Sequence, residues 1–429
     1  MKRLTIWIFV LAVVFVSFTI ASAQTFSFKT DPVVQYEGYM ASSSTALVSF
    51  EPNMTLPQVA KRVAAVGFNV ESFSTIEGIA YKPEELLPLK GFKARDLTYT
   101  LVKFNDIDIE DAIQILRTMP GVTEAYPNYV HEILMTPNDP GWTVYQGDFR
   151  QIYVDKAWDI SNGQNAVVAV IDTGFRKTGM QDLPEYILPG YDFYYNDTNP
   201  NDFIGHGTHV SNTIAERTNN SKGVAGIAYK AKIMPLKVFP DYNGGAYDSD
   251  IIDAINYAVS NGAKVINMSL GGGGYSGQTN TAINNAFNNE VLPFAASGNS
   301  GAGTVEYPAA YANCVAVGSV KRHNVGANPV RSSFSNYGTA LDLVAPGENI
   351  LQETFNSSFT VGYYLFSGTS MATPHAAAVA ALLVAHGGAD ASRIRDVMYA
   401  TAHNPAGAGK WTNTLGWGEV DAYKALQNY

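Results

Sequence analysis

The chain has 429 residues, of which 46% are hydrophobic, 12% are aromatic and only 15% are charged. This composition excludes a disordered, collagen-like or coiled-coil protein, and the length fits two or three packed domains. The 28 Lys and Arg residues are outnumbered by 38 Asp and Glu residues, and no basic run follows the first three residues, so we expect no nucleic acid partner. A single cysteine, Cys314, excludes an intrachain disulfide, and its apolar neighbours indicate a buried side chain without redox chemistry.

The first 23 residues have the pattern of a secretory signal peptide. Lys2 and Arg3 precede an uncharged, mostly apolar stretch from Leu4 to Ile20, and Ala21-Ser-Ala23 supplies the small residues that signal peptidases accept. This stretch is short for a membrane core of about 30 Å, and no basic stop-transfer flank follows it. Cleavage after Ala23 is therefore favoured over a membrane anchor, and we expect a secreted product, extracellular or periplasmic.

Residues 24–135 predict a small α+β domain with a βαββαβ (ferredoxin-like) plan. Strands are expected at 46–50, 99–104 and 122–130, and helices with apolar positions at helical spacing at 56–66 and 108–119. The next stretch, Thr136–Gly141, is polar and contains two prolines, which is typical of an exposed linker. We place the domain boundary there, so that 136–429 is a second domain.

In this second domain, short apolar runs alternate with helical patterns. The runs lie at 166–171, 233–239, 264–270, 291–296 and 314–320. The alternation predicts an α/β fold whose mostly parallel sheet is covered by helices on both faces. Because ligands gather at the carboxyl ends of such strands, the polar residues after these runs are candidates for function.

Three motifs supply side chains with catalytic chemistry. Asp172 ends the strand pattern Val170-Ile-Asp-Thr-Gly174, His206 opens Gly205-His-Gly-Thr-His209, and Ser370 lies in Gly368-Thr-Ser-Met-Ala-Thr-Pro-His375. Taken singly, the Asp fits a helix cap or metal ligand and the Ser fits an N-cap. The two histidines raise the possibility of zinc, but their spacing of three without an intervening Glu does not match a zincin. Together, however, the motifs offer a nucleophile, a base and an orienting carboxylate.

The order Asp172, His206, Ser370 and the three motifs around them resemble the subtilisin-like serine peptidases over about residues 137–429. The resemblance implies a secreted serine endopeptidase that cleaves proteins through an acyl-enzyme on Ser370, with Asn299 as an oxyanion donor and no organic cofactor. A lipase-type esterase does not fit, because residues 366–370 read Phe-Ser-Gly-Thr-Ser rather than Gly-x-Ser-x-Gly. A catalytically silent binding protein on the same fold is the alternative.

The resemblance also implies which segments bind substrate. They comprise one strand edge, a facing wall and a flanking strand, namely Ser269, Leu270, Gly271 and Gly272, then Ala296, Ser297 and Gly298, then Gly245 and Tyr247. Since Ser300 rather than an acidic residue follows Asn299, we expect no carboxylate at the pocket next to the scissile bond. A large apolar or aromatic side chain is the expected preference there.

Two further expectations follow from the resemblance. Residues 24–135 would be a propeptide that assists folding and then acts as an intramolecular inhibitor, with autocleavage near Leu134 to Thr136, and the product would be a monomer. Calcium would be a structural ion, held by oxygens of Asp182, Asn220, Lys222 and Val224, with a second ion at Asp192, Asp197, Asn199 and Asn201. Solvated polar turns explain both calcium segments equally well.

Overall fold

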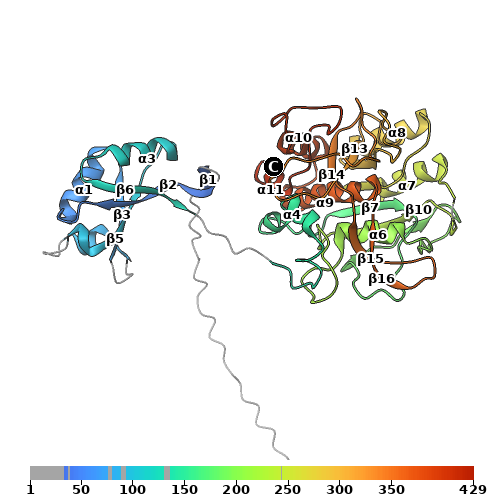
Figure 1. Cartoon of the computed structure of the whole chain (residues 1–429), viewed down its shortest axis with the longest axis horizontal. Coiled ribbons are helices and arrows are strands. Elements are labelled where there is room, and N and C mark those ends of the chain that lie inside the picture. The colour runs from blue at the N-terminus through green and yellow to red at the C-terminus, as the bar shows by residue number, and fades with distance from the viewer. Residues whose placement is uncertain (1–32, 37–38, 76–79, 88–92, 130–135, 243) are drawn as a thin grey trace, which may run out of the picture. The chain divides into compact units, whose positions relative to one another are not determined.

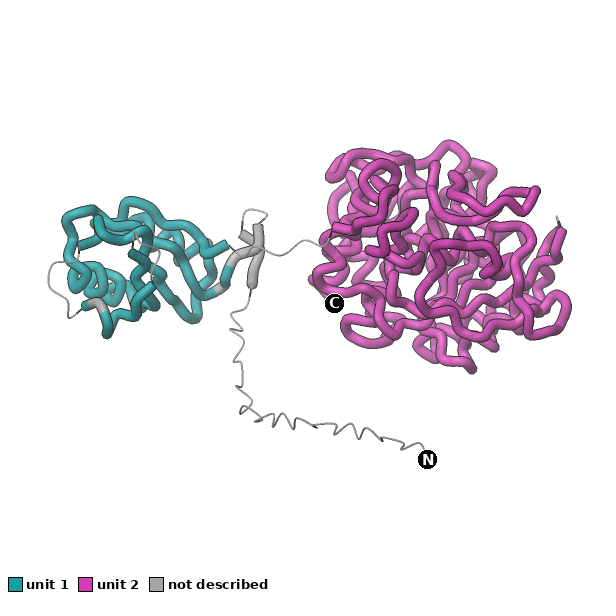
Figure 2. Tube along the Cα trace, turned by 90° about the horizontal axis from the view of Figure 1, so that it is seen from below, with its two compact units in different colours: residues 1–132 teal, residues 133–429 magenta. Residues whose placement is uncertain are grey.

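The computed structural model describes residues 33–429 except 37–38, 76–79, 88–92, 130–135 and 243 (Figure 1). The chain forms two compact units, residues 1–132 and 133–429 (Figure 2). The expected signal peptide and most of the expected autocleavage region lie outside the described residues. Among the helices that are described, none has the length and apolar character needed to cross a membrane.

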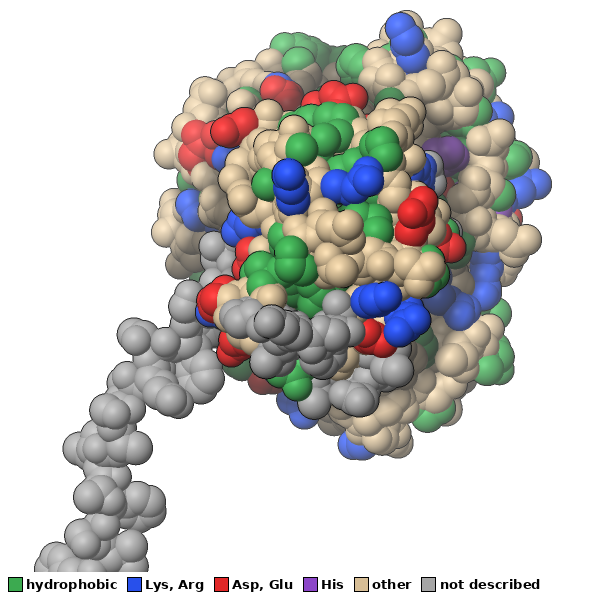
Figure 3. All heavy atoms as spheres, turned by 90° about the vertical axis from the view of Figure 1, so that its left-hand side faces the viewer, with side chains coloured by type: hydrophobic (Ala, Val, Ile, Leu, Met, Phe, Trp, Pro, Cys, Tyr) green, Lys and Arg blue, Asp and Glu red, His purple; other side chains and the backbone are tan. Residues whose placement is uncertain are grey.

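The first unit is an antiparallel sheet with helices. Its strands run in the order β1-β2-β5-β3-β4 with β6 paired to β2, and they are β1 (Val33–Tyr36), β2 (Tyr39–Phe50), β3 (Asn69–Thr75), β4 (Ala80–Tyr81), β5 (Leu97–Lys103) and β6 (Val122–Tyr129). The helices are α1 (Leu56–Ala65), α2 (Pro83–Leu86), α3 (Ile109–Thr118) and the 3-10 turn Ala94–Asp96. Each strand and helix range expected from the sequence overlaps one of these elements. β3 is the strand that the βαββαβ plan required without a range, whereas β1, β4 and α2 were not expected. On the face shown in Figure 3, cationic and anionic side chains are scattered among uncharged ones.

The second unit is built on a parallel sheet. Its strand order is β14-β13-β12-β11-β7-β10-β8, with β9 also paired to β10. The strands are β7 (Val167–Asp172), β8 (Tyr186–Ile187), β9 (Tyr191–Asp192), β10 (Lys232–Lys237), β11 (Val265–Met268), β12 (Leu292–Ala296), β13 (Val315–Val320) and β14 (Leu343–Pro346). Every pairing in this sheet is parallel. Each of the five apolar runs thus holds one strand.

Helices cover both faces of this sheet, as the sequence predicted. Along β7, Val168 and Val170 join a core that includes α6 (His206–Ala215) and α9 (Thr369–Gly387). Ala169 and Ile171 join a second core that includes α7 (Asp248–Ser260) and α8 (Gly277–Asn288). Burial on both faces explains why the strand patterns read as continuous apolar runs. The helices are α4 (Gly147–Gln151), α5 (Val154–Ala157), α6 (His206–Ala215), α7 (Asp248–Ser260), α8 (Gly277–Asn288), α9 (Thr369–Gly387), α10 (Ala391–Thr401) and α11 (Ala422–Gln427), and a hairpin of β15 (Ile350–Phe355) and β16 (Val361–Phe366) precedes α9.

The stretch Thr136–Gly141 is not the exposed linker that its composition indicated. Asp139 is buried, and its carboxylate accepts hydrogen bonds from the backbone nitrogens of Asn219 (2.7 Å) and Asn220 (3.1 Å). The side-chain oxygen of Asn138 accepts from the nitrogen of Ser221 at 2.7 Å. The polar residues of this stretch therefore satisfy donors of the loop after α6 instead of water, and the linker prediction was wrong.

Candidate active site

Asp172 and His206 lie together at the carboxyl edge of the sheet. Asp172 is the last residue of β7 and is fully buried, and its Oδ1 lies 2.8 Å from Nδ1 of His206, the first residue of α6. Gly207 makes this approach possible, because a Cβ there would lie 2.3 Å from the Gly174 carbonyl oxygen and 3.1 Å from Asp172 Oδ1. The hydrogen bond to the carboxylate leaves Nε2 of His206 as the nitrogen for chemistry.

The surroundings of His206 favour its protonated form. Burial lowers the pKa of His206, but the negative charge of Asp172, the hydrogen bond to it and the charge of Asp202 outweigh burial, so the pKa is raised. Asp202 is held in place by the backbone nitrogens of Ile204 and Gly205, each 2.9 Å from its Oδ1. A base of this kind is poised to take a proton near neutral pH and to carry it as an imidazolium paired with Asp172.

Ser370 lies in the first turn of α9, beside the end of β11. Its hydroxyl donates to the carbonyl of Ser269 at 3.1 Å, and the Ser269 hydroxyl donates to the Ser370 carbonyl at 2.8 Å. β11 is the sheet neighbour of β7, and α9 packs against α6. The strand that ends in Asp172, the helix that begins with His206 and the helix that carries Ser370 therefore pack against one another in the second unit (Figure 1).

Asn299 presents an amide donor next to the Ser370 backbone nitrogen. The Asn299 Oδ1 accepts from the nitrogen (2.8 Å) and hydroxyl (3.0 Å) of Thr369, which fixes the amide so that Nδ2 points away from Thr369. A Cβ placed on Gly368 would lie 3.6 Å from both Asn299 Nδ2 and the Ser370 nitrogen. Because Gly368 has no side chain, these two nitrogens lie near one open position, with Asn299 Oδ1 3.7 Å from the same point. Two N–H donors close together are what an oxyanion site uses.

Comparison with known proteins identifies this arrangement. Residues 163–418 match the Subtilase family, Peptidase_S8. The chain belongs to the subtilase family. It is 40% identical over 329 residues to the thermophilic serine proteinase of Bacillus sp. (strain AK1), covering 76% of this chain and 78% of that protein. It is also 40% identical over 293 residues to thermitase of Thermoactinomyces vulgaris, covering 68% of this chain and 99% of that protein.

Solved subtilase structures agree with this assignment. Fervidolysin from Fervidobacterium pennivorans, described as a keratinolytic enzyme related to subtilisin, superposes with a TM-score of 0.61 at 25% identity, covering 92% of this chain and 62% of that one. A protease from Pseudoalteromonas arctica gives a TM-score of 0.60 at 33% identity, covering 68% of this chain and 99% of that one. The chain is therefore a subtilisin-like serine endopeptidase, a hydrolase, on the expected fold.

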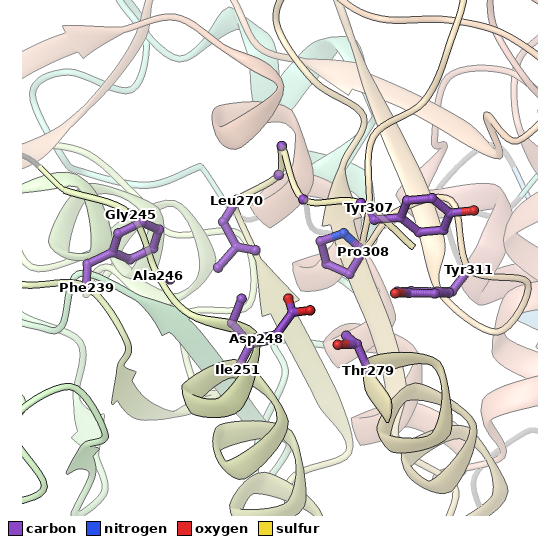
Figure 4. Close-up of a pocket in the computed structure, with 14 residues that line it drawn as sticks. Phe239, Gly245, Ala246, Asp248, Ile251, Leu270, Thr279, Tyr307, Pro308 and Tyr311 are labelled. Atoms are coloured by element: carbon purple, nitrogen blue, oxygen red, sulfur yellow. The ribbon is translucent and has the colours of Figure 1, made fainter. Parts of the chain in front are cut away.

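One of the segments expected to bind substrate contacts Ser370 through Ser269. Beyond Ser269, the segment Leu270–Gly274 lines a cavity of about 300 Å³ together with Gly245, Asp248 and Tyr307 (Figure 4). Tyr247, which the resemblance places beside a pocket further along the substrate, is not among the residues that line this cavity. Its ring is 65% exposed and stacks on Tyr194 with the ring centroids 6.3 Å apart. Its chain neighbours Ala246 and Asp248 do line the cavity, so the role of Tyr247 stays a prediction.

A carboxyl group lies between the expected walls of the first pocket, where we expected none. Glu306 follows β12 by ten residues, and its carboxyl group lies between Gly271 on one expected wall and Gly298 on the other. A Cβ on Gly298 would lie 2.7 Å from Glu306 Oε1, and one on Gly271 would lie 3.0 Å from Oε2. A sequence signal was present, because Glu306 is the one acidic residue between Glu290 and Asp342.

The first calcium segment has features that fit a cation. Asp182 is buried; its Oδ1 accepts from Asn220 Nδ2 at 2.7 Å, and its Oδ2 has no hydrogen-bond partner. Burial raises the pKa of Asp182 to about 6, and burial together with the charges of Asp182 and Glu353 raises that of the neighbouring Glu216. Because unpartnered buried carboxylate oxygens are costly, a hard cation would stabilise this position. Even so, the described residues contain no group of three or more His, Cys, Asp or Glu side chains arranged to hold a metal.

The second calcium segment does not fit an ion. The Lys237 ammonium group, itself 1% exposed, lies 4.0 Å from Asp192 Oδ2 and 3.1 Å from Asp241 Oδ1. Asp192 Oδ1 and Asp197 Oδ1 accept from backbone nitrogens at 3.0 and 2.7 Å. Asn199 and Asn201 line a different cavity, beside Phe175. Since a buried lysine already supplies the positive charge, we derive no role for calcium there.

His209 and Cys314 have structural surroundings, as expected. Burial lowers the pKa of His209 to about 3, and its Nε2 lies 3.0 Å from the Ile350 carbonyl, with the ring stacked on Phe366. The His209 ring is thus held by a backbone carbonyl and by packing against Phe366. Cys314 is buried, and burial raises the pKa of its thiol.

Proposed function

We propose that this subtilase is a secreted endopeptidase that cuts proteins through the triad Asp172, His206 and Ser370, made as a self-processing zymogen. The observation that supports it most is the 2.8 Å contact between the buried Asp172 carboxylate and His206, at the edge where Ser370 begins α9. The carboxylate holds the imidazole in the tautomer whose Nε2 accepts a proton.

In the proposed reaction, the Ser370 side chain turns from the Ser269 carbonyl toward His206 Nε2. His206 takes the hydroxyl proton as Ser370 Oγ bonds to the scissile carbonyl carbon, and the resulting oxyanion accepts from Asn299 Nδ2 and the Ser370 nitrogen. His206 then gives its proton to the leaving amine, and the acyl-enzyme remains. Water, activated by the same base, releases the carboxylate product and restores the Ser370 hydroxyl.

The remaining parts of the proposal concern maturation. Residues 1–23 would direct export, and residues 24–135 would be the inhibitory propeptide, removed near the region between the two compact units. The bonds from Asn138 and Asp139 to the loop after α6 would then anchor the new N-terminus. Where Asp182, Asn220 and the carbonyls of Lys222 and Val224 hold calcium, the ion would stabilise this same loop without taking part in chemistry.

The test is intact mass spectrometry of the chain expressed without residues 1–23. We expect the normal chain to separate near residue 135, while Ser370→Ala stays whole. Ser358→Ala is the control, because Ser358 is exposed in the turn between β15 and β16. A Ser370→Ala chain that still processes itself would reject the nucleophile assignment. Intact chains for all three proteins that also fail to hydrolyse casein would favour the binding-protein alternative.

A further inference from the structure

We propose that Glu306 directs this endopeptidase to cleave after lysine or arginine. The inference rests on the proposed function of the Ser370 site and names the substrate side chain that its first pocket takes. It is carried by the position of the Glu306 carboxyl group between the two walls of that pocket.

The two walls are adjacent and lack side chains where they face each other. The Ser269 carbonyl accepts from the Ser370 hydroxyl, and Gly271 lies two residues further along the chain. Two residues span at most about 7 Å, so the glycine wall begins close to the nucleophile. A Cβ on Gly271 would lie 3.6 Å from the Ala296 carbonyl oxygen, which places the two walls side by side. The backbone nitrogen of Glu306 donates to the Ser297 carbonyl at 3.0 Å and fixes the residue against the second wall.

Asn336 sets the orientation of the Glu306 carboxyl group. The Asn336 side chain is buried, and its Oδ1 accepts from the Ser300 nitrogen (3.0 Å), the Ser300 hydroxyl (2.9 Å) and the Ala302 nitrogen (3.0 Å). Because the oxygen is saturated by three donors, Nδ2 must face the other way, where it donates to Glu306 Oε1 at 3.2 Å. Oε2 therefore faces the glycine wall: it would lie 3.0 Å from a Cβ placed on Gly271 and 4.0 Å from one placed on Gly272.

Within the part of the chain that the structure describes, the Glu306 carboxyl group has no cationic partner. None of the ion pairs among the described residues involves Glu306. An apolar substrate side chain entering the pocket would remove water from this carboxylate without replacing it, which is unfavourable. A lysine or arginine side chain supplies a long apolar stem for the glycine walls and a cation for Oε2, so the pocket stabilises it instead.

The experiment compares five peptide 4-nitroanilides that differ only in the residue before the scissile bond: arginine, its neutral analogue citrulline, lysine, its neutral analogue norleucine, and phenylalanine. We expect kcat/KM of the processed enzyme to be about tenfold or more higher for arginine than for citrulline and for lysine than for norleucine. Glu306→Gln should reduce both ratios to about twofold or less and raise kcat/KM for norleucine. Asp253→Asn, which removes an exposed acidic group of α7, is the matched control and should keep both ratios.

Two results would overturn the inference. One is a processed enzyme that prefers phenylalanine or norleucine to the basic residues, and the other is a Glu306→Gln enzyme with unchanged ratios. Failure of the proposed function gives a different result, since then none of the five peptides is cut. In that case, binding of fluorescent peptides to the Ser370→Ala chain, with and without Glu306→Gln, still measures the preference for arginine over citrulline.

Discussion

Replacing Asn299 separates its two roles in the structure, because its two side-chain ends face different partners. Oδ1 accepts two hydrogen bonds from Thr369, while Nδ2 borders the open position next to the Ser370 nitrogen. Asn299→Ala removes both ends. Asn299→Asp keeps the acceptor for Thr369 but places a negative oxygen where the oxyanion develops.

The magnitudes differ for folding and for catalysis. Each hydrogen bond to Thr369 contributes about 1 kcal/mol, so Asn299→Ala should lower the free energy of unfolding by about 1–2 kcal/mol and Asn299→Asp by less. For the oxyanion donor we adopt the value known from subtilisin, about 2.7–4 kcal/mol, which lowers kcat by about 10²–10³. Asn299→Asp should lose at least as much kcat as Asn299→Ala, because repulsion is added to the missing donor.

The assay is steady-state hydrolysis of a peptide 4-nitroanilide by processed enzyme, together with urea unfolding of inactivated samples. We expect kcat to fall with KM changed by less than about threefold, since the donor acts on the transition state. If kcat of Asn299→Ala stays within threefold of normal, or if Asn299→Asp is the more active variant, the assigned direction of the amide is wrong.

Three further predictions concern the base, the loop after α6 and the packing beneath His206. The pKa of His206 is raised, and only the neutral ring accepts a proton, so kcat/KM should rise with pH through an apparent pKa above that of ordinary imidazole. Asp172→Asn should move this apparent pKa to lower pH, and an unmoved apparent pKa would contradict the pairing of Asp172 with His206. If calcium is bound at Asp182, a chelator should lower the free energy of unfolding by about 2.7 kcal/mol, relative to protein at a calcium concentration about 100 times Kd. This loss should appear as a lower midpoint temperature of thermal inactivation. If the chelator lowers the midpoint of Asp182→Asn by the same amount, the ion is bound elsewhere. Gly207→Ala should lower kcat at least about tenfold, because its Cβ would lie 2.3 Å from the Gly174 oxygen, whereas Gly277→Ala, with open space around it, should be near normal in the same assay.

The parts of the fold that the sequence predicted are those governed by local pattern. β7, β10, β11, β12 and β13 each overlap a mostly apolar run, because strands buried on both faces favour apolar side chains at most positions. Periodicity likewise located α1 and α3. The two-residue strands β4, β8 and β9 are too short for such a pattern. In the hairpin, β16 is partly exposed, and β15 is buried but contains the polar residues Gln352, Glu353 and Thr354.

The motifs predicted Asp172, His206, Ser370 and Asn299 as one site because each follows a strand or opens a helix at the same sheet edge, and the structure brings Asp172 and His206 into contact. Interactions between distant polar loops were not predictable in this way. Asp139 and the loop at 219–221 are about eighty residues apart in sequence, and only the folded chain shows that one satisfies the other.

Glu306 shows why a pocket's charge is harder to predict than its catalytic residues. The sequence argument examined the position after Asn299 and found Ser300, but the structure uses Ser300 to hold Asn336, and Asn336 in turn holds the carboxyl group of Glu306. Three segments, at 298–300, 306 and 336, are therefore needed to place one negative charge, and no local motif links them. A catalytic motif is constrained within a few residues by the backbone around it, whereas the preference of a pocket depends on which distant loop reaches its base. The peptide comparison with Glu306→Gln tests this dependence directly, because it removes the charge and leaves both glycine walls and the triad unchanged.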